Sequence, residues 1–349
     1  SCCGDVKMIG YYLENDEFEY DIQGLLMAFY PGEELAKNPV EEPAVPVHVP
    51  DPGPGSHTER KNRLKRGLYR ELSRRTGKTL PWGTLTGIRP TKLAMGRLEE
   101  GASDEEILRF LREEYLVGEE KSRLSLEIAH REKEILREID YEKGYSLYIG
   151  IPLCPTTCLY CSFTSYPMTK WAPRMGEYLD ALSQEIQWTA RRFRDRKLNS
   201  LYIGGGTPTS LSPELLDRLL GEVCRSFDFS DLKEFTVEGG RPDSITREKL
   251  QVLKDYPVTR ISINPQTMKE ETLRLIGRRH TVEDIRQAFH LAREMGFDNI
   301  NMDMILGLPQ ETPADVERTV EEIEKLGPDS LTVHALAVKR ASRLKMEAH

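Results

Sequence analysis

The sequence predicts an α/β protein: a partial barrel of six strand–helix units, preceded by a smaller domain of α/β and helical structure. From residue 145 onward, short apolar runs alternate with amphipathic helical patterns, as in parallel strands joined by helical crossovers. Earlier, residues 38–57 contain six prolines and read as a linker or long loop. We expect an N-terminal extension domain at 1–140, with the linker near 38–57, and a core barrel at 141–349.

The barrel elements follow from apolar periodicity and helix-start signals. Six strands are expected, at residues 145–151, 198–204, 234–239, 258–263, 299–306 and 329–336. Helical patterns lie between them, near 174–195, 213–224, 246–255, 281–295 and 313–326. Ser212 followed by Pro213 has the order of an N-cap and a first helical residue. Such strands form a parallel sheet or a partial barrel, and ligands should gather at their C-terminal ends.

The N-terminal part is expected to begin with a small α/β piece and to become helical. Residues 103–106, "SDEE", have capping-box spacing and open one helix, and another runs through 119–140. Residues 60–97, the basic segment, hold twelve Lys or Arg and one acid, Glu71, in a chain of net charge −8. We interpret the basic segment either as a solvated helix face or as a surface for anions such as propionates, phosphates or RNA. Of the ligands, we expect an anionic small molecule or a domain contact rather than nucleic acid.

Composition excludes several classes of protein. The chain of 349 residues is 38% hydrophobic and 30% charged, as in a globular protein, and no apolar run is long enough to span a bilayer. The first residues, "SCCGDVKMIGYY", show no secretory signal. Three of the six cysteines cluster in one short loop, which favours a metal or catalytic site over a disulfide framework. We therefore expect a reducing, cytoplasmic location, with no membrane partner.

The stretch "IPLCPTTCLYCSF" places Cys154, Cys158 and Cys161 at spacing C-x₃-C-x₂-C, directly after the first barrel strand. Thiolates are the usual ligands of iron–sulfur clusters, and a [4Fe–4S] cluster has four irons. Three cysteines leave one iron free to bind a ligand. A zinc site or a redox C-x₂-C pair is the alternative. Cys2, Cys3 and Cys224 lie apart from the cluster, and we interpret them as structural or incidental.

Other polar residues follow the later strands. The second strand ends in "GGGTPT", where glycines would let the backbone approach a ligand and turn its N–H groups outward, or would simply form a tight turn. Glu238, Gln266 and Asp303 lie at the ends of strands three, four and five, and Arg278 follows Gln266. Carboxylates and amides suit ribose hydroxyls and an amino group, and an arginine suits a carboxylate.

These motifs resemble the radical S-adenosylmethionine (SAM) superfamily. The resemblance implies a partial (β/α)₆ radical SAM barrel in which SAM chelates the open iron of a [4Fe–4S] cluster. One electron from the cluster then cleaves SAM to methionine and a 5′-deoxyadenosyl radical. It also assigns a catalytic role to the three cluster cysteines. The family's SAM contacts fall on Tyr148, Tyr160, Gly205, Gly206, Thr207, Glu238, Gln266, Arg278 and Asp303, and more loosely on Ala335.

Longer stretches resemble one branch of that superfamily, the oxygen-independent coproporphyrinogen III oxidase group. They are "YIGIPLCPTTCLYCSF", "YIGGGTPTSL", "INPQTMKEETLRLIGRRHT" and "INMDMILGLPQETPADV". "TVEGGRPDSIT" and "PWGTLTGIRPTKL" are similar to HemZ-type members. The sequence departs from the oxidases at Phe163, where they have a further cysteine, and at Glu238–Pro242, where their usual pattern is Glu-x-Asn-Pro. A C-terminal substrate-covering domain is expected to be absent or truncated.

The resemblance implies an enzyme of haem biosynthesis that converts coproporphyrinogen III to protoporphyrinogen IX without oxygen. It takes a tetrapyrrole substrate and electrons from a donor such as flavodoxin or ferredoxin. Arg241 and Arg89 are candidates for propionate recognition, with structural salt bridging as the alternative. A haem chaperone or haem-binding protein is the second hypothesis, with His334 and His48 as possible axial ligands. An RNA-modifying enzyme is the third, but the basic segment lacks interleaved aromatics, so we do not expect nucleic acid as a partner.

Overall fold

The computed structural model describes residues 8–87, 89–140, 143–339 and 342–346. By its internal contacts the chain divides into two compact units, Ser1–Glu138 and Ile139–His349. Cys2 and Cys3 lie outside the described residues. In the part of the chain that is described, no helix is both long and apolar enough to cross a membrane.

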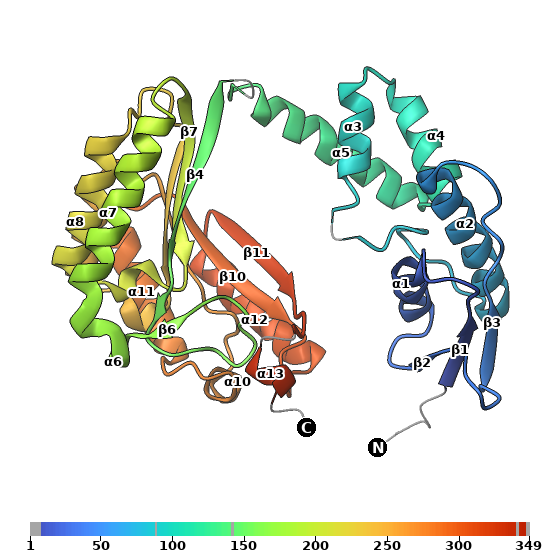
Figure 1. The fold of residues 1–349 in the computed structure, drawn as a ribbon. Coiled ribbons are helices and arrows are strands. Elements are labelled where there is room, and N and C mark those ends of the chain that lie inside the picture. The colour runs from blue at the N-terminus through green and yellow to red at the C-terminus, as the bar shows by residue number, and fades with distance from the viewer. Residues whose placement is uncertain (1–7, 88, 141–142, 340–341, 347–349) are drawn as a thin grey trace. The chain divides into compact units, whose positions relative to one another are not determined.

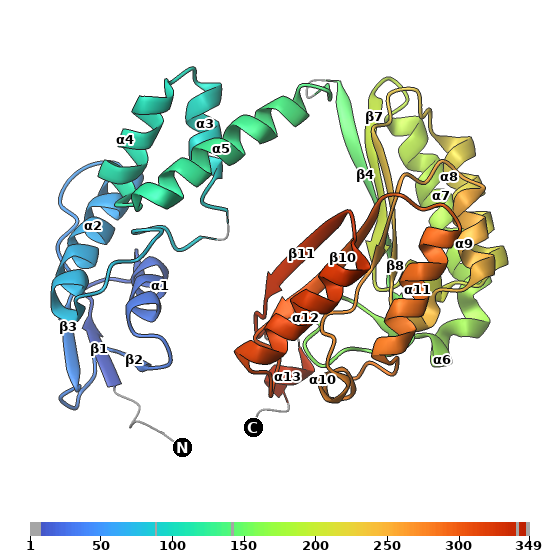
Figure 2. The same cartoon turned by 180° about the vertical axis from the view of Figure 1, so that it is seen from behind.

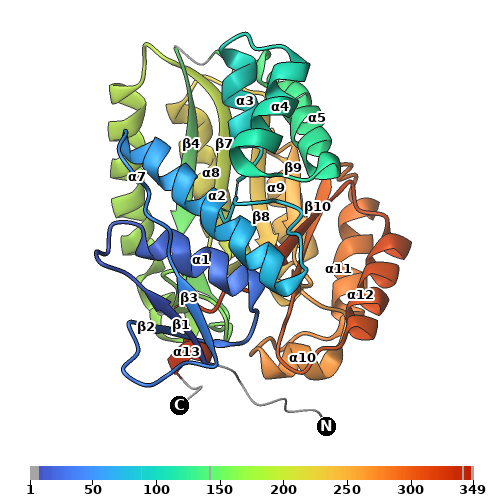
Figure 3. The ribbon, with the colours of Figure 1, turned by 90° about the vertical axis from the view of Figure 1, so that its right-hand side faces the viewer.

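The first unit combines a small parallel sheet with helices (Figure 1). Its strands are β1 (Met8–Tyr12), β2 (Glu34–Lys37) and β3 (Val45–His48), in the order β2-β1-β3. Its helices are α1 (Glu19–Phe29), α2 (His57–Thr76), α3 (Lys92–Glu99), α4 (Asp104–Tyr115) and α5 (Glu119–Leu136). One apolar cluster joins α1 and α2 to the sheet, and a second joins α3, α4 and α5, which lie side by side in Figure 3.

Strand β3 corrects the interpretation of residues 38–57 as a linker. Val45–His48 pairs in parallel with β1, and Val47 is fully buried in the core. Pro46 is tolerated because β3 is an edge strand, so the missing N–H of proline interrupts no second ladder. The proline-rich composition correctly indicated extended backbone, but it could not show that a partner strand lies alongside.

Helix boundaries in both units follow the local chemistry of the sequence. The Ser103 hydroxyl accepts a hydrogen bond from the backbone N–H of Glu106, and the Glu106 carboxylate accepts one in return, so the predicted capping box is confirmed at α4. Ser212 caps the helix that starts at Pro213 in the same manner, by accepting from the Leu215 N–H.

The second unit contains a curled, fully parallel sheet, which confirms the predicted partial barrel. Its strands are β4 (Gly144–Ile151), β7 (Lys197–Gly205), β8 (Glu234–Gly240), β9 (Arg260–Ile263), β10 (Ile300–Leu306) and β11 (Ser330–Ala335), and they lie side by side in chain order. The two short strands β5 (Leu153–Cys154) and β6 (Tyr166–Pro167) form a separate pair.

Helices cover the outer face of this sheet, as Figure 2 shows for α8, α9, α11 and α12. The helices are α6 (Met168–Trp171), α7 (Met175–Arg192), α8 (Pro213–Ser226), α9 (Arg247–Lys254), α10 (Glu270–Leu275), α11 (Val282–Glu294), α12 (Pro313–Leu326) and α13 (Arg343–Met346), with 3₁₀ turns η1 (Ala172–Arg174), η2 (Pro208–Ser210) and η3 (Pro242–Ser244). The apolar faces of α7 to α12 and the strands β4 and β7 to β10 form one continuous core. The concave face and the C-terminal strand ends are left for polar side chains.

Candidate functional site

A cavity of about 470 Å³, here called the cysteine cavity, lies at the C-terminal ends of the strands in the second unit. Its volume falls within the range of small-molecule sites. The structure brings together at its walls the predicted residues Tyr148, Cys154, Cys158, Tyr160, Cys161, Gly205, Gly206, Thr207, Glu238, Gln266, Arg278 and Asp303. Ala335 is not among the lining residues; it pairs with Leu306 at the end of β11.

The three cysteines lie on a loop that begins in β5 and is tied to distant parts of the chain. The backbone N–H of Leu159 donates to the carbonyl of Ile276 at 2.9 Å, and the Thr156 hydroxyl donates to the carbonyl of Gly277 at 2.8 Å. The Thr207 hydroxyl donates to the Cys154 Sγ at 3.5 Å. Burial raises the pKa of the Cys154 and Cys161 thiols above the ordinary value.

The chemistry of this donor set fits a cluster more closely than a single ion. Cys154, Cys158 and Cys161 are free thiols that line one cavity. Within the described residues, no group of three His, Cys, Asp or Glu side chains is arranged to hold one metal ion. A cluster is larger than one ion and places its cysteine ligands further apart, and thiolates are its usual ligands.

The glycine turn after β7 packs against the cysteine loop. The backbone N–H groups of Gly206 and Thr207 donate to the carbonyls of Ile151 and Leu153, at 2.8 and 2.7 Å. A Cβ atom at Gly206 would lie 2.5 Å from the Leu153 carbonyl oxygen, so no larger residue fits. The expectation that the N–H groups turn outward is therefore wrong at these two positions, because they hold the turn to the β4–β5 chain.

One wall of the cavity carries the acidic residues at strand ends. The Tyr202 hydroxyl donates to Glu238 Oε1 at 2.5 Å, and the Tyr202 ring stacks on Tyr148 with centroids 5.9 Å apart. Burial raises the pKa of Glu238 above its ordinary value, the Tyr202 hydrogen bond opposes that shift, and the nearby Asp303 adds to it. Asn301 donates to Asp303 Oδ1 at 2.6 Å. Both carboxylates keep further acceptor capacity for hydroxyl or amino groups of a ligand.

The opposite wall presents buried polar atoms without partners. Arg278 is 6% exposed, and its guanidinium donates to the Asn264 carbonyl and, at 3.5 Å, to the Tyr160 hydroxyl. The Nε of Arg278, Oε1 of Gln266 and Oδ1 of Asn264 are buried with no hydrogen-bond partner. Because an unmet buried polar atom costs free energy, three of them at one cavity indicate a missing polar ligand.

Gln266 also has an uncommon backbone. Its φ is +67°, a left-handed conformation that non-glycine residues rarely adopt. The surroundings hold it there: the Gln266 N–H donates to the Asp303 carbonyl at 2.9 Å, and the Ile305 N–H donates to the Gln266 carbonyl at 3.0 Å. Such strain is maintained where a side chain must face a particular direction.

The family model of the radical SAM superfamily matches residues 148–323. The chain belongs to the radical SAM superfamily. It is 45% identical over 293 residues to the Bacillus subtilis "Oxygen-independent coproporphyrinogen-III oxidase-like protein HemZ", covering 83% of this chain and 58% of that protein. It is 40% identical over 195 residues to the Bacillus subtilis "Heme chaperone HemW", covering 56% of this chain and 51% of that protein.

Among solved structures, the chain resembles the coproporphyrinogen III oxidase HemN from Escherichia coli, described as a radical SAM enzyme. The TM-score is 0.54 and the identity 29%, over 62% of this chain and 50% of that one. The chain thus spans between about half and three-fifths of the length of these relatives. Radical SAM proteins use a [4Fe–4S] cluster and SAM, and the unpartnered polar atoms of Arg278, Gln266 and Asn264 beside three thiols fit that pair of cofactors.

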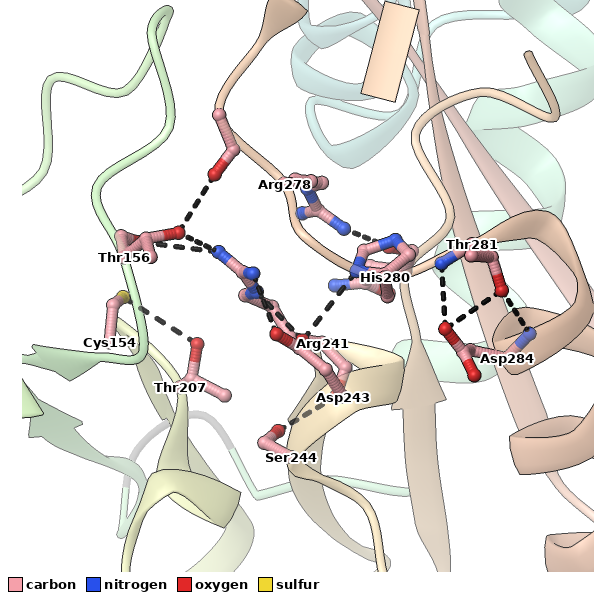
Figure 4. A network of polar contacts seen from close by, with 12 residues as sticks. Cys154, Thr156, Thr207, Arg241, Asp243, Ser244, Arg278, His280, Thr281 and Asp284 are labelled. Carbon is pink, nitrogen blue, oxygen red and sulfur yellow. Dashed lines mark hydrogen bonds and ion pairs between the residues drawn. The ribbon is translucent and has the colours of Figure 1, made fainter. Parts of the chain in front are cut away.

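Within the radical SAM site, Arg241 has a role that sequence analysis assigned differently. Arg241 is 2% exposed, and its guanidinium donates two hydrogen bonds to the Asp243 carboxylate, at 3.0 and 2.8 Å. It also donates to the hydroxyl and carbonyl of Thr156 in the cysteine loop, at 2.5 and 3.3 Å (Figure 4). His280 Nδ1 lies 3.5 Å from Asp243. These contacts favour the structural salt bridge over propionate recognition as the role of Arg241, because its guanidinium already has partners.

Asp243, His280 and Asn264 had no role assigned from the sequence. The first two complete the network around Arg241, and Asn264 lines the cysteine cavity. "GGRPDS" and "RRHT" carried a weak signal, because charged residues and histidine directly follow strand or helix ends there. The role of these residues could not be predicted from the sequence, because it depends on contacts between distant segments. Thr156 and Gly277, for example, are 121 positions apart in the sequence and hydrogen-bonded in the fold.

The remaining candidates lie in different places. His334 lines the cysteine cavity. His48 belongs to the first unit, where it stacks on Tyr12 with centroids 5.5 Å apart, and Arg89 is an exposed loop residue of the same unit. Cys224 is a half-buried free thiol of α8 that packs against the core, as its helix pattern indicated.

Most cationic side chains of the basic segment have ion-pair or hydrogen-bond partners within their own unit. Arg60 pairs with Glu17, Lys65 with Asp21 and Arg66 with Glu114, while Arg74 and Arg75 pair with Glu71 and Arg97 with Glu100. Arg63 donates to the carbonyls of Pro52 and Pro54, and Lys78 to that of Phe29. These partners favour the interpretation as a helix face over a surface for anions.

Proposed function

We propose that this chain binds SAM in the cysteine cavity and takes part in haem biosynthesis, by the oxygen-independent oxidative decarboxylation of coproporphyrinogen III to protoporphyrinogen IX. The observation that carries the proposal is the convergence of three thiols with unpartnered atoms of Arg278, Gln266 and Asn264 on one cavity. The similarity to HemZ and to the oxidase HemN supports the tetrapyrrole class of substrate. We place the reaction in the cytoplasm, with flavodoxin or ferredoxin as electron donor.

Different residues of the cavity are suited to bind different groups of the cluster and of SAM. Cys154, Cys158 and Cys161 would each hold one iron. Arg278 is suited to the carboxylate of SAM and Gln266 to its amino group. Bound together, the cluster and SAM supply a radical that removes a hydrogen atom from a substrate carbon.

On the other wall, Asp303 is suited to the ribose hydroxyls, since it has oxygens left to accept hydrogen bonds. Glu238 is half-buried in the same wall and accepts a hydrogen bond from the Tyr202 hydroxyl. Tyr148 is 60% exposed at the cavity and offers an aromatic face to a planar group. The Thr207 hydroxyl donates to Cys154, which would keep that sulfur oriented toward the cavity.

A haem-handling protein is the second candidate function, because Phe163 replaces the further cysteine of the oxidases. Its ring is 70% exposed and lines the cysteine cavity, so the thiol is exchanged for an apolar surface at the mouth of the site. The similarity to HemW, a relative named as a haem chaperone, supports this alternative. His334 lines the same cavity and is the candidate axial ligand.

One experiment separates these functions. The protein is reconstituted anaerobically with iron and sulfide, supplied with SAM, reduced flavodoxin and coproporphyrinogen III, and its products are analysed by mass spectrometry. The proposal predicts 5′-deoxyadenosine together with a tetrapyrrole that has lost two carboxyl groups, and no product with Cys161→Ala. Formation of 5′-deoxyadenosine with an unchanged tetrapyrrole would contradict it. Stoichiometric haem binding that is lost in His334→Ala would then establish the haem-handling function.

A further inference from the structure

A second cavity of the same unit, here called the basic cleft, opens beside the cysteine loop. Its volume is about 780 Å³, and four arginines line it: Arg274, Arg278, Arg279 and Arg343. Among the described residues its lining contains no Asp or Glu. This is a concentrated positive charge on a chain whose net charge is −8.

The basic cleft shares a wall with the cysteine cavity. Thr156 and Arg278 line both of them, and Pro155 and Thr157 line the basic cleft. The neighbouring residues in the loop, Cys154 and Cys158, line the cysteine cavity. The loop that carries the thiols therefore separates the two cavities, with cysteines on one side and an arginine-lined surface on the other.

Two of the four arginines of the basic cleft, Arg274 and Arg279, differ from those that stabilise the fold. Arg274 and Arg279 are exposed, and within the described part of the chain neither has an ion pair or side-chain hydrogen bond. On α2, by contrast, Arg60 and Arg66 reach carboxylates of their own unit. Like charges gathered in a concave surface repel one another, so their clustering is better explained by an acidic partner than by stability.

We propose that the basic cleft is the docking surface for an acidic electron-carrier protein, and that electrons enter the site through the cysteine loop. The inference rests on the proposed function only in that the chain holds the cluster. Each cleavage of SAM takes up one electron, so the carrier, a low-potential flavin or iron–sulfur protein, is oxidised by one electron as the cluster is reduced by one. Electrostatic attraction across such a surface speeds association and fixes the docked orientation.

The experiment compares a protein reductant with a small one. Arg274→Glu/Arg279→Glu is reconstituted beside the wild type and beside Arg192→Glu, which makes the same kind of charge change on α7 outside the cleft lining. The rate of SAM cleavage is measured without tetrapyrrole, once with reduced flavodoxin and once with dithionite. Iron content and the melting temperature of each protein are recorded to show that it is folded and loaded.

With flavodoxin at low ionic strength, we expect the double variant to cleave SAM at least about tenfold more slowly than the wild type, and the difference to shrink in high salt. With dithionite the two rates should agree within about twofold, because a small reductant needs no docking surface. Arg192→Glu should behave as the wild type. Calorimetry measures the affinity of each cluster-free protein for oxidised flavodoxin. This affinity should be lower for the double variant than for the wild type and Arg192→Glu.

Three outcomes would overturn the proposal. An equal loss with both reductants would show that the arginines support the site rather than a partner. Unchanged rates and affinity with flavodoxin would place docking elsewhere. RNA binding that is lost in the double variant would make the basic cleft a nucleic-acid site. None of these results depends on the identity of the tetrapyrrole, so they are distinguishable from a failure of the proposed decarboxylation.

Discussion

In the first unit, most cations of α2 lie against carboxylates, whereas in the second unit several polar groups of the cysteine cavity are buried and have atoms without partners. Arg66 pairs with Glu114, and Lys65, only 7% exposed, pairs with Asp21. At the cysteine cavity, Arg278 is buried just as deeply but leaves its Nε unpartnered, as does the amide oxygen of Gln266. The number of charged groups in a region is therefore a poorer guide to ligand binding than whether those groups already have partners. Only groups without partners gain new hydrogen bonds from a ligand.

The largest effect should come from the cysteine loop itself. Replacing Cys154 by Ala removes one of three ligands, so we expect the protein to reconstitute no four-iron cluster and to lose SAM cleavage completely. Iron and sulfide analysis with electron paramagnetic resonance measures the cluster. Cys224→Ala, a half-buried thiol on α8, is the control and should retain both. Full iron content in Cys154→Ala would remove that residue from the ligand set.

The next effect concerns the unpartnered wall of the cavity. Arg278→Ala should weaken SAM binding by about 2–4 kcal/mol, since a shielded arginine that grips a carboxylate is lost. Calorimetry on the reconstituted protein measures the affinity, and its iron content should stay normal. Gln266→Ala should have a smaller effect of the same sign. Unchanged affinity in Arg278→Ala would show that the unpartnered Nε serves another purpose.

A third prediction tests whether the ion pair of Arg241 stabilises the fold, as the ion pairs of α2 do. Asp243→Asn leaves the buried Arg241 without its charge partner, so we expect the free energy of unfolding to fall by about 2–3 kcal/mol. Chemical denaturation of the cluster-free protein measures it. Glu294→Gln breaks the exposed pair with Arg247 and should cost less than about 1 kcal/mol. Equal losses in the two variants would contradict the structural role of the network.

The same network predicts the response to acid. Burial would raise the pKa of Asp243, but the nearby His280 ring and the hydrogen bonds from Arg241 hold it well below the ordinary value. A carboxyl with a depressed pKa in the folded state stabilises the fold above its unfolded-state pKa, and this contribution is lost as the pH falls toward the folded value. The wild type should therefore lose more stability than Asp243→Asn between about pH 5 and pH 2. Parallel denaturant midpoints would contradict this.

The smallest effect is expected at the basic segment. Changing Arg63, Arg66 and Arg74 together to Gln removes internal contacts with Pro52, Glu114 and Glu71, which should cost about 1–2 kcal/mol of stability at most and leave SAM cleavage unchanged. The wild type should show no micromolar binding of single-stranded RNA at physiological salt. RNA modification would be favoured if the logarithm of the RNA affinity fell with the logarithm of the salt concentration with a slope of about −0.7 per contacted phosphate. The triple variant would then also have to lose this binding.

The sequence by itself determined the elements of the second unit and the order of its chemical motifs. Each predicted barrel strand appears within about two residues of its expected ends, because the alternation of apolar runs and amphipathic helices is a local property of the chain. The capping signals at Ser103 and Ser212 were likewise local. The three cysteines lie within eight residues, and so their proximity needed no fold to establish it.

Only the tertiary structure decided what the side chains between those motifs do. Arg241 looked available for a propionate until the fold placed Asp243 and Thr156 against its guanidinium. The N–H groups of Gly206 and Thr207 proved to bind strand carbonyls, and Val45–His48 proved to be an edge strand. The basic cleft joins Pro155–Thr157 to arginines more than a hundred positions later in the chain. Pairing between residues so far apart depends on packing, which no local pattern encodes.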